Sequence, residues 1–173
     1  VSNDALETFQ DEVTTVDLLP LESFHNHTVK ILNSSTAEDD YYLKFVAENG
    51  VGGYGYWEET RARDVSPGLD NTTLPHELAN TGATTFTFGP ITYKERKTGD
   101  TTTNPDPSFV GKKIACTFFF NNRFGVLAED NVILGVANDN YNFFSKSALT
   151  AIDPDPVDLN VSSVRPVRLF EVA

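Results

Sequence analysis

Short apolar runs separated by polar turns dominate the chain from Thr28 onward. Four of these runs precede residue 90. They are rich in β-branched and aromatic residues and are bounded by Asn, Ser, Gly and Asp clusters. Runs of this length and composition predict β-strands. The four segments are TVKIL (28–32), YYLKFVA (41–47), YGYWEE (54–59) and TTFTFG (84–89).

The N-terminal segment follows a different period. Ala5, Leu6, Phe9 and Val13 recur near helical spacing, and polar residues that can cap a helix precede them. This pattern predicts a short helix within residues 2–13.

A second group of apolar runs lies in the last third of the chain, each run separated from the next by a short polar turn. This arrangement predicts four strands in an antiparallel meander, as in a propeller blade or a barrel segment. No second copy recurs at a fixed period, so the chain does not contain a whole propeller. The runs are IACTFFFN (114–121), RFGVLA (123–128), NVILGVA (131–137) and YNFFS (141–145).

Two segments are rich in Pro, Gly and Thr and lack periodicity. They are Asp64–Thr73 and Lys97–Ser108, and the second indicates a linker. We therefore predict a mainly β fold, with a small α+β, β-rich domain over residues 1–92. A linker over 93–108 and a β-meander over 109–173, resembling part of a β-propeller, complete the predicted domain organisation.

Composition limits the ways in which this fold can be stabilised. A chain of 173 residues can bury a core of its own. Its single cysteine, Cys116, cannot form an intrachain disulfide and is interpreted as a buried small hydrophobe. Methionine is absent even at position 1, which indicates processing or a piece of a longer polypeptide. We find no secretory signal and no run of the ~20 apolar residues that span a bilayer.

Negative charge is concentrated in the first third of the chain. Residues 1–60 hold two basic and twelve acidic side chains, a net charge of −10, whereas residues 61–173 hold eleven basic and thirteen acidic side chains. An acidic surface repels phosphates, which argues against sequence-specific binding of DNA or RNA. Solubility alone would also explain it.

The segment GVGGYG, with Gly50, Gly52 and Gly55, matches the dinucleotide-binding pattern G-x-G-x-x-G. That pattern must open a helix whose N-terminus holds the pyrophosphate. The following residues carry no apolar helical stripe and soon reach Pro67-Gly68. A glycine-rich hairpin loop is the better interpretation.

Two groups of residues suggest a metal site. His25 and His27 would share one face of a strand, with His76 or a carboxylate as the further ligand. The alternative is two histidines in a loop or at a strand edge. The segment DPDPVD (153–158) offers Asp153, Asp155 and Asp158, but it lacks the central Gly and the terminal Glu of calcium loops, so its prolines favour a rigid extended turn.

Aromatic and acidic residues combine in Tyr54, Tyr56, Trp57, Glu58 and Glu59, as in a site that binds or cleaves sugars. Consecutive residues of a strand point to opposite faces, so the two glutamates cannot flank one glycosidic bond. The segment is better explained as a half-buried hairpin.

Other reactive patterns are absent from the sequence. No G-x-S-x-G elbow, P-loop or H-E-x-x-H occurs, and the apolar run around Cys116 disfavours a thiolate. The four sequons at Asn26, Asn33, Asn71 and Asn160 are incidental to loop composition.

Several segments, in this order and spacing, resemble the nozzle proteins (tail tubular protein B) of short-tailed bacteriophages. Each is weak alone, and together they cover most of the chain from about Val13. The segments are LPHEL (74–78), TTFTFGP (84–90), RKTGDTTTNPDPSFVGKKI (96–114), FFFNNRFGVLAEDNVIL (118–134), NYNFF (140–144), DPDPVDL (153–159) and RPVRLFE (165–171).

The resemblance implies the central part of a longer structural subunit in the virion tail, arranged as a hexameric ring. The ring would lie below an adaptor ring, carry tail fibres and enclose a channel for genome ejection, through which viral DNA passes without sequence-specific binding. It implies no catalytic, cofactor-binding or metal-binding residues. The phenylalanines of 118–120 would alternate between the faces of a sheet, and the turns would be shaped by Asn121, Asn122, Glu129, Asp130 and Asn131.

Two further expectations follow for function. Because a lumen lined with Lys and Arg would hold DNA, we hypothesise that part of the acidic excess of residues 1–60 faces the channel or its mouth, although solvent is an equal alternative. The competing function is a carbohydrate-binding or polysaccharide-depolymerising tail module that uses Tyr54–Glu59.

Overall fold

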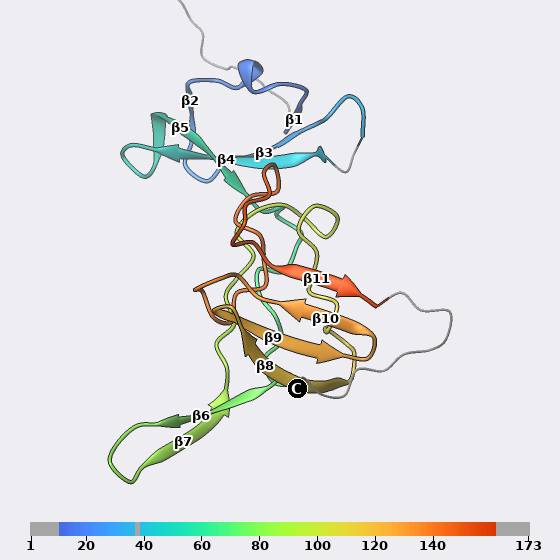
Figure 1. Cartoon of the computed structure of the whole chain (residues 1–173). Helices are drawn as coiled ribbons and strands as arrows, with labels where there is room; N and C mark the ends of the chain where they lie inside the picture. The colour runs from blue at the N-terminus through green and yellow to red at the C-terminus, as the bar shows by residue number, and fades with distance from the viewer. Residues whose placement is uncertain (1–10, 37–38, 162–173) are drawn as a thin grey trace, which may run out of the picture. The chain divides into compact units, whose positions relative to one another are not determined.

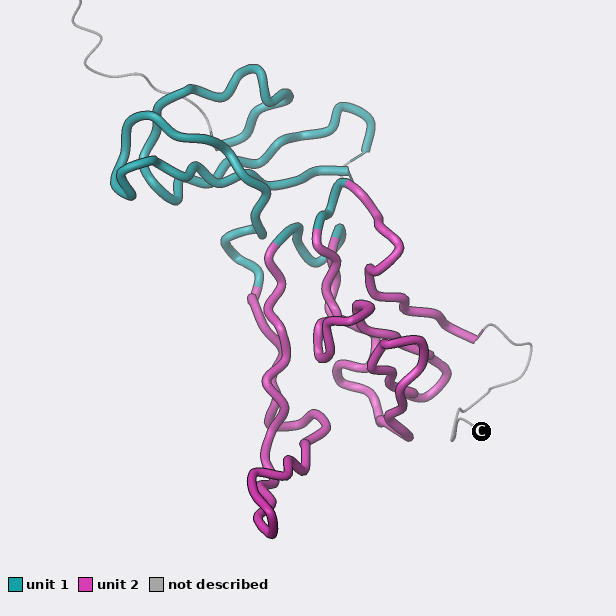
Figure 2. Tube along the Cα trace, turned by 60° about the vertical axis from the view of Figure 1, so that its left-hand side comes forward, with its two compact units in different colours: residues 1–65, 98–103, 147–149 teal, residues 66–97, 104–146, 150–173 magenta. Residues whose placement is uncertain are grey.

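The computed structural model describes residues 11–36 and 39–161, which belong to two compact units (Figure 2). Unit 1 comprises residues 1–65, 98–103 and 147–149, and unit 2 comprises residues 66–97, 104–146 and 150–173. Their regular structure is almost entirely β (Figure 1), which confirms a mainly β fold. The predicted division into residues 1–92, 93–108 and 109–173 stays a prediction.

Unit 1 is built on one five-stranded sheet with the order β1-β3-β4-β5-β2. A single turn of 3₁₀ helix, η1 (Val16–Leu18), lies between β1 and β2 in the chain. β1 pairs with β3 in parallel, and the remaining pairs are antiparallel. The strands are β1 (Glu12–Val13), β2 (Glu22–Phe24), β3 (Thr28–Ile31), β4 (Tyr41–Ala47) and β5 (Gly52–Thr60).

The core of unit 1 lies on one face of this sheet. Alternate residues of β3 and β4 are buried there, including Val29 and Phe45, both with no exposed surface. Trp57 of β5 packs edge-on against Phe45, with ring centroids 5.2 Å apart, and its indole N–H donates to the Pro20 carbonyl. Gly55 is required beside them, because a Cβ there would collide with the Val46 carbonyl and the Phe45 ring.

The predicted N-terminal helix over residues 2–13 lies mostly outside the described residues. At Glu12–Val13 the prediction is wrong, because this segment is strand β1. The amide of Lys30 donates to the Asp11 carbonyl and the amide of Leu32 donates to the Val13 carbonyl. Pairing with β3 therefore overrides the local helical spacing.

Unit 2 contains a four-stranded antiparallel sheet with the order β11-β10-β9-β8. The first three strands of the predicted meander are confirmed. Its strands are β8 (Ile114–Phe120), β9 (Arg123–Ala128), β10 (Asn131–Leu134) and β11 (Val157–Asn160).

The predicted fourth strand at 141–145 is wrong, and β11 takes its place beside β10. Tyr141 has a φ of 67°, which an extended strand does not allow. The Asn142 amide donates to Asp139 and its carbonyl accepts from Val136, so the backbone turns back on itself. This turn directs Phe143 into the core.

The tight turns of the meander form at 121–122 and 129–130 as expected, whereas Asn131, which was also expected to shape a turn, begins strand β10. Asn121 and Asn122, between β8 and β9, have φ values of 46° and 57°, and Glu129, between β9 and β10, has 54°. Two successive positive φ values match the twist of paired strands in a two-residue hairpin. In β8, Phe118 faces Gly125 and Phe119 faces Phe124, so neighbouring phenylalanines point to opposite faces, as predicted.

A separate two-stranded hairpin joins β6 (His76–Asn80) to β7 (Phe86–Pro90). It stands apart from the four-stranded sheet (Figure 1) and pairs with no other described strand. Leu74 and Ile91, on either side of it, are buried in the core of unit 2 with Phe109, Phe124 and Phe143. The hairpin is therefore anchored at its base.

Candidate functional site

Residues 48–51 form the turn between β4 and β5, and the glycine-rich segment 50–55 runs from this turn into β5. Gly50 and Gly53 have φ values of 72° and 99°. Asn49 Oδ1 accepts hydrogen bonds from the amides of Val51 and Gly52, at 2.8 and 2.9 Å. The chain continues as β5 rather than as a helix, which confirms the hairpin interpretation. No helix N-terminus is available at this turn for a pyrophosphate.

The histidines of the candidate metal site each contact other groups. His25 Nδ1 accepts from the Ala47 amide at 3.3 Å. His27 Nδ1 lies 2.8 Å from Ser23 Oγ, and its Nε2 lies 3.3 Å from an Asp11 carboxylate oxygen. His76, in unit 2, stacks on Phe88. Within residues 11–36 and 39–161, no three His, Cys, Asp or Glu side chains group as metal ligands would.

The aspartates of segment 153–158 stabilise its conformation. The Asp155 carboxylate accepts from the Ile152 amide at 2.9 Å, and Asp158 accepts from both the amide and the hydroxyl of Ser108, at 2.7 and 2.6 Å. The Arg123 guanidinium donates to the carbonyls of Asp153 and Asp155, both at 2.6 Å. The structure confirms a turn at 153–155, after which the segment enters β11.

The two glutamates of the candidate sugar site lie on opposite faces of β5, as predicted. Glu58 pairs with Lys44 at 2.9 Å. Glu59 accepts from the Ala148 amide at 2.6 Å. Both carboxylates are therefore occupied by structural contacts and do not converge on one substrate bond. Tyr54 and Tyr56 remain exposed beside them.

Cys116 corrects one expectation. Its side chain is half-buried rather than buried, because β8 is an edge strand of the described sheet. The thiol lies 3.3 Å from the Thr117 carbonyl.

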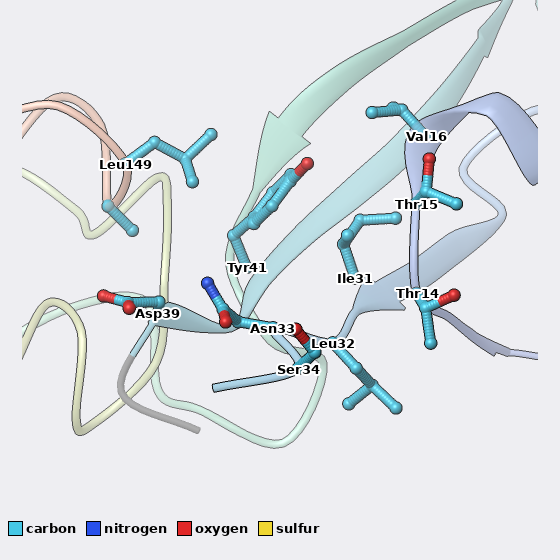
Figure 3. Close-up of a pocket in the computed structure, with 11 residues that line it drawn as sticks. Thr14, Thr15, Val16, Ile31, Leu32, Asn33, Ser34, Asp39, Tyr41 and Leu149 are labelled. Carbon is cyan, nitrogen blue, oxygen red and sulfur yellow. The ribbon is translucent and has the colours of Figure 1, made fainter. Parts of the chain in front are cut away.

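A hollow of about 520 Å³ opens in unit 1 (Figure 3). Among its described lining residues the one carboxylate belongs to Asp39, which accepts a hydrogen bond from Thr36 Oγ1 at 2.8 Å. Asn33 Oδ1 accepts from the Ser35 amide. The lining residues are Thr14, Thr15, Val16, Ile31, Leu32, Asn33, Ser34, Asp39, Tyr41, Ala148 and Leu149.

Buried Arg96 is a central residue of unit 2 that the sequence patterns do not reveal. Only 2% of its surface is exposed. Its guanidinium donates to the carbonyls of Asn104 and Ser66, at 2.7 and 2.9 Å, and to the Asp106 carboxylate at 2.6 Å. It also lies over the Phe144 ring, 4.7 Å from the centroid. Arg96 thus holds loops that are distant in sequence.

A second buried charge stabilises unit 1. The Asp40 carboxylate lies 2.8 Å from the Lys30 ammonium and accepts from the Asn33 amide. Burial by itself would raise the pKa of Asp40, but these two hydrogen bonds outweigh it and hold the pKa below its ordinary value. The hydrogen bond that the Lys30 ammonium donates to Asp40 is also the main reason why the pKa of Lys30 is raised.

The clearest candidates for function are exposed apolar surfaces. In unit 2, Leu78, Phe86 and Phe88 on the β6–β7 hairpin are 66%, 58% and 72% exposed. On edge strand β8, Phe119 and Phe120 are 63% and 56% exposed. Exposed apolar groups of this size typically mark contacts with other macromolecules.

Comparison with known proteins gives one family. The family model described as "Bacteriophage nozzle protein" matches residues 1–172. A similar curated protein is the tail tubular protein gp12 of Escherichia phage T7, which is 35% identical over 148 residues. The match covers 85% of this chain and 18% of the T7 protein, so the chain spans less than a fifth of that relative's length.

Proposed function

This chain belongs to the bacteriophage nozzle protein family, and on that premise we propose that it forms part of the channel through which a viral genome leaves the capsid. It is a structural component of a phage tail. The family match over residues 1–172 is the observation that carries the proposal, and the T7 relative named as a tail tubular protein supports it.

The proposal includes no catalytic turnover. The acidic residues of the candidate sugar site, Glu58 and Glu59, are engaged by the Lys44 ammonium and the Ala148 amide. The carbohydrate alternative is therefore not favoured. It predicts glycan binding or release of reducing ends, whereas a conduit predicts neither.

We further propose that the subunit assembles as a hexameric ring that contacts an adaptor ring and tail fibres. Exposed apolar surfaces in both units favour assembly, because a solitary soluble protein rarely leaves several such groups in water. Viral DNA would pass through without sequence-specific contacts. In the part of the chain that the structure describes, no helix combines the length and apolarity needed to cross a membrane.

Purified virions test this function directly. Antibodies raised against this chain should label the tail of intact particles, and mass spectrometry of isolated tails should find its peptides at the stoichiometry of the ring. A matched antibody against a capsid protein is the control. Virions that lack the chain altogether, or that carry it only in the capsid shell, would overturn the proposal.

A further inference from the structure

The β6–β7 hairpin, residues 76–90, presents one continuous apolar face. In the register of the pair, Leu78 lies opposite Phe88 and Asn80 opposite Phe86, so their side chains share a face. His76 stacks on Phe88 with ring centroids 5.4 Å apart. The opposite face carries Glu77, Ala79, Thr87 and Gly89 in the same register. We call residues 76–90 the arm.

Among the described residues, no third strand pairs with the arm. An isolated two-stranded hairpin is at best marginally stable in water, and stability usually requires a third strand or a packed face. Its base is fixed by buried Leu74 and Ile91, and Glu77 accepts a hydrogen bond from the Tyr141 hydroxyl at 3.3 Å. Beyond this base, five residues per strand reach about 17 Å. A partner surface along that length would complete the fold of the arm.

The chemistry of the arm restricts the kind of partner. Residues 74–91 contain no Lys or Arg, which disfavours phosphate backbones and anionic lipid. The tip, residues 81–85, is Thr-Gly-Ala-Thr-Thr and offers no apolar wedge for a bilayer. The apolar side chains lie on the side of the arm instead. This arrangement suits an apolar protein surface.

Unit 2 contains a surface of this kind at strand β8. β8 is an edge of the described sheet, and Phe119 and Phe120 are exposed on it. An open strand edge can accept an additional strand, and neighbouring aromatic side chains strengthen such pairing. Within one copy, Phe88 and Phe119 both remain exposed, so the arm does not cover β8 of its own chain.

We propose that the arm of one subunit docks along β8 of the next subunit in the ring. A ring built from identical copies needs two unlike surfaces on each copy, one that is donated and one that is received. The arm and β8 are two such unlike surfaces, and both belong to unit 2. The inference rests on the proposed ring and names the surfaces that close it.

The size of the contact is compatible with this role. An aromatic side chain buries about 150–250 Å² when fully covered, so the exposed parts of Phe86 and Phe88 would add roughly 200–300 Å². A standard interface takes about 800 Å² from each partner. The two phenylalanines of one arm would therefore supply about a third of the area that their subunit buries in this contact.

Cysteine pairing in the full-length subunit tests the docking. In a C116S background, Phe88→Cys combined with Phe119→Cys should give, after mild oxidation, a ladder of covalent oligomers that ends at the ring size. Either substitution alone should give no ladder. Thr87→Cys, on the opposite face of the arm, combined with Phe119→Cys is the matched control and should cross-link much less.

Two further measurements separate failure of the arm from failure of the ring. In native mass spectrometry, the Phe86→Ser/Phe88→Ser variant should form rings only at a subunit concentration at least tenfold higher than wild type needs. Maleimide should label Phe88→Cys in free subunits and not in assembled rings. Normal rings with fully labelled Phe88→Cys, a cross-link within one chain, or protection by lipid vesicles would overturn the docking and leave the ring intact. A wild-type subunit that never forms rings would overturn the proposed assembly itself.

Discussion

Arg96 shows how one residue can organise a segment that reads as a polar linker. Its guanidinium is buried and holds Ser66 and Asn104, which lie 30 and 8 residues away. Removing this side chain lowers the free energy of unfolding, because its loss leaves buried carbonyls without donors. Lysine would not replace Arg96, because its ammonium lacks the planar fork of donors of a guanidinium.

We expect Arg96→Ala to lower the free energy of unfolding by roughly 2–5 kcal/mol, because the carbonyls of Ser66 and Asn104 lose their donor at about 1–3 kcal/mol each. Asp106→Asn should cost less than about 1 kcal/mol, because Asp106 is half exposed and asparagine keeps an acceptor. Urea denaturation of both variants measures the difference. The neighbouring exposed Lys97→Ala is the control, and equal losses for Arg96→Ala and Lys97→Ala would contradict the role of Arg96.

The Lys30–Asp40 pair gives a prediction for pH. The pKa of Asp40 is lower in the folded than in the unfolded chain, so its contribution to stability is present above the unfolded pKa and is lost as pH falls through the folded pKa. Asp40→Asn should therefore destabilise unit 1 at pH 7, and its difference from wild type should shrink as pH falls below the ordinary aspartate pKa of about 3.9. Thermal melting from pH 7 to pH 2.5 measures this, with exposed Asp17→Asn as control. A gap that stays constant with pH would refute it.

At the scale of elements, strands whose own sequence shows a strand pattern could be predicted. Strands that form only because a neighbouring strand pairs with them could not. β8 to β10 combine apolar alternation with Asn-rich turns, so sequence suffices for them. β6 and β11 have few β-branched residues, and they are strands because β7 and β10 pair with them. Segment 141–145 has strand composition, yet the positive φ of Tyr141 turns it.

The same reasoning applies to the candidate surfaces. The aromatic alternation of 84–89 predicts a strand, but nothing in its sequence tells whether Phe86 and Phe88 face a core or solvent. That outcome depends on whether another layer covers the hairpin, and in the described chain none does. Long-range partners such as those of Arg96 and Arg123 escape sequence patterns for the same reason.

Arg123 holds the turn at residues 153–155, which leads into β11. Its guanidinium donates to the carbonyls of Gly135, Pro154, Asp153 and Asp155. Arg123→Lys keeps the charge but replaces this fork with a single ammonium, so the turn at 153–155 should open more often.

Hydrogen exchange checks this at one amide. The Ala137 amide donates to the Pro154 carbonyl at 2.9 Å, so it should exchange at least tenfold faster in Arg123→Lys. The Lys112 amide, which donates to the Phe109 carbonyl, is the internal reference and should not change. Unchanged protection of the Ala137 amide would show that Arg123 does not hold the turn.

At the scale of the whole molecule, the acidic first third bears on how DNA would move through the proposed channel. DNA carries one negative charge per about 1.7 Å of axis, so an acidic wall repels it weakly and leaves it free to slide, whereas basic side chains would bind it. Asp17 and Glu48 are exposed and belong to the segment that holds a net charge of −10. If this segment faces the channel or its mouth, reversing their charges would create sites where DNA pauses.

Asp17→Lys/Glu48→Lys in the full-length subunit should therefore slow genome ejection from purified virions, measured by the fluorescence of a DNA-binding dye. The delay should shrink as salt rises from 50 to about 200 mM, because bound phosphates are released by counterions. The neutral variant Asp17→Asn/Glu48→Gln separates added attraction from lost repulsion and should eject nearly as fast as wild type. Normal ejection at low salt by the lysine variant would place these acids on the solvent side of the wall.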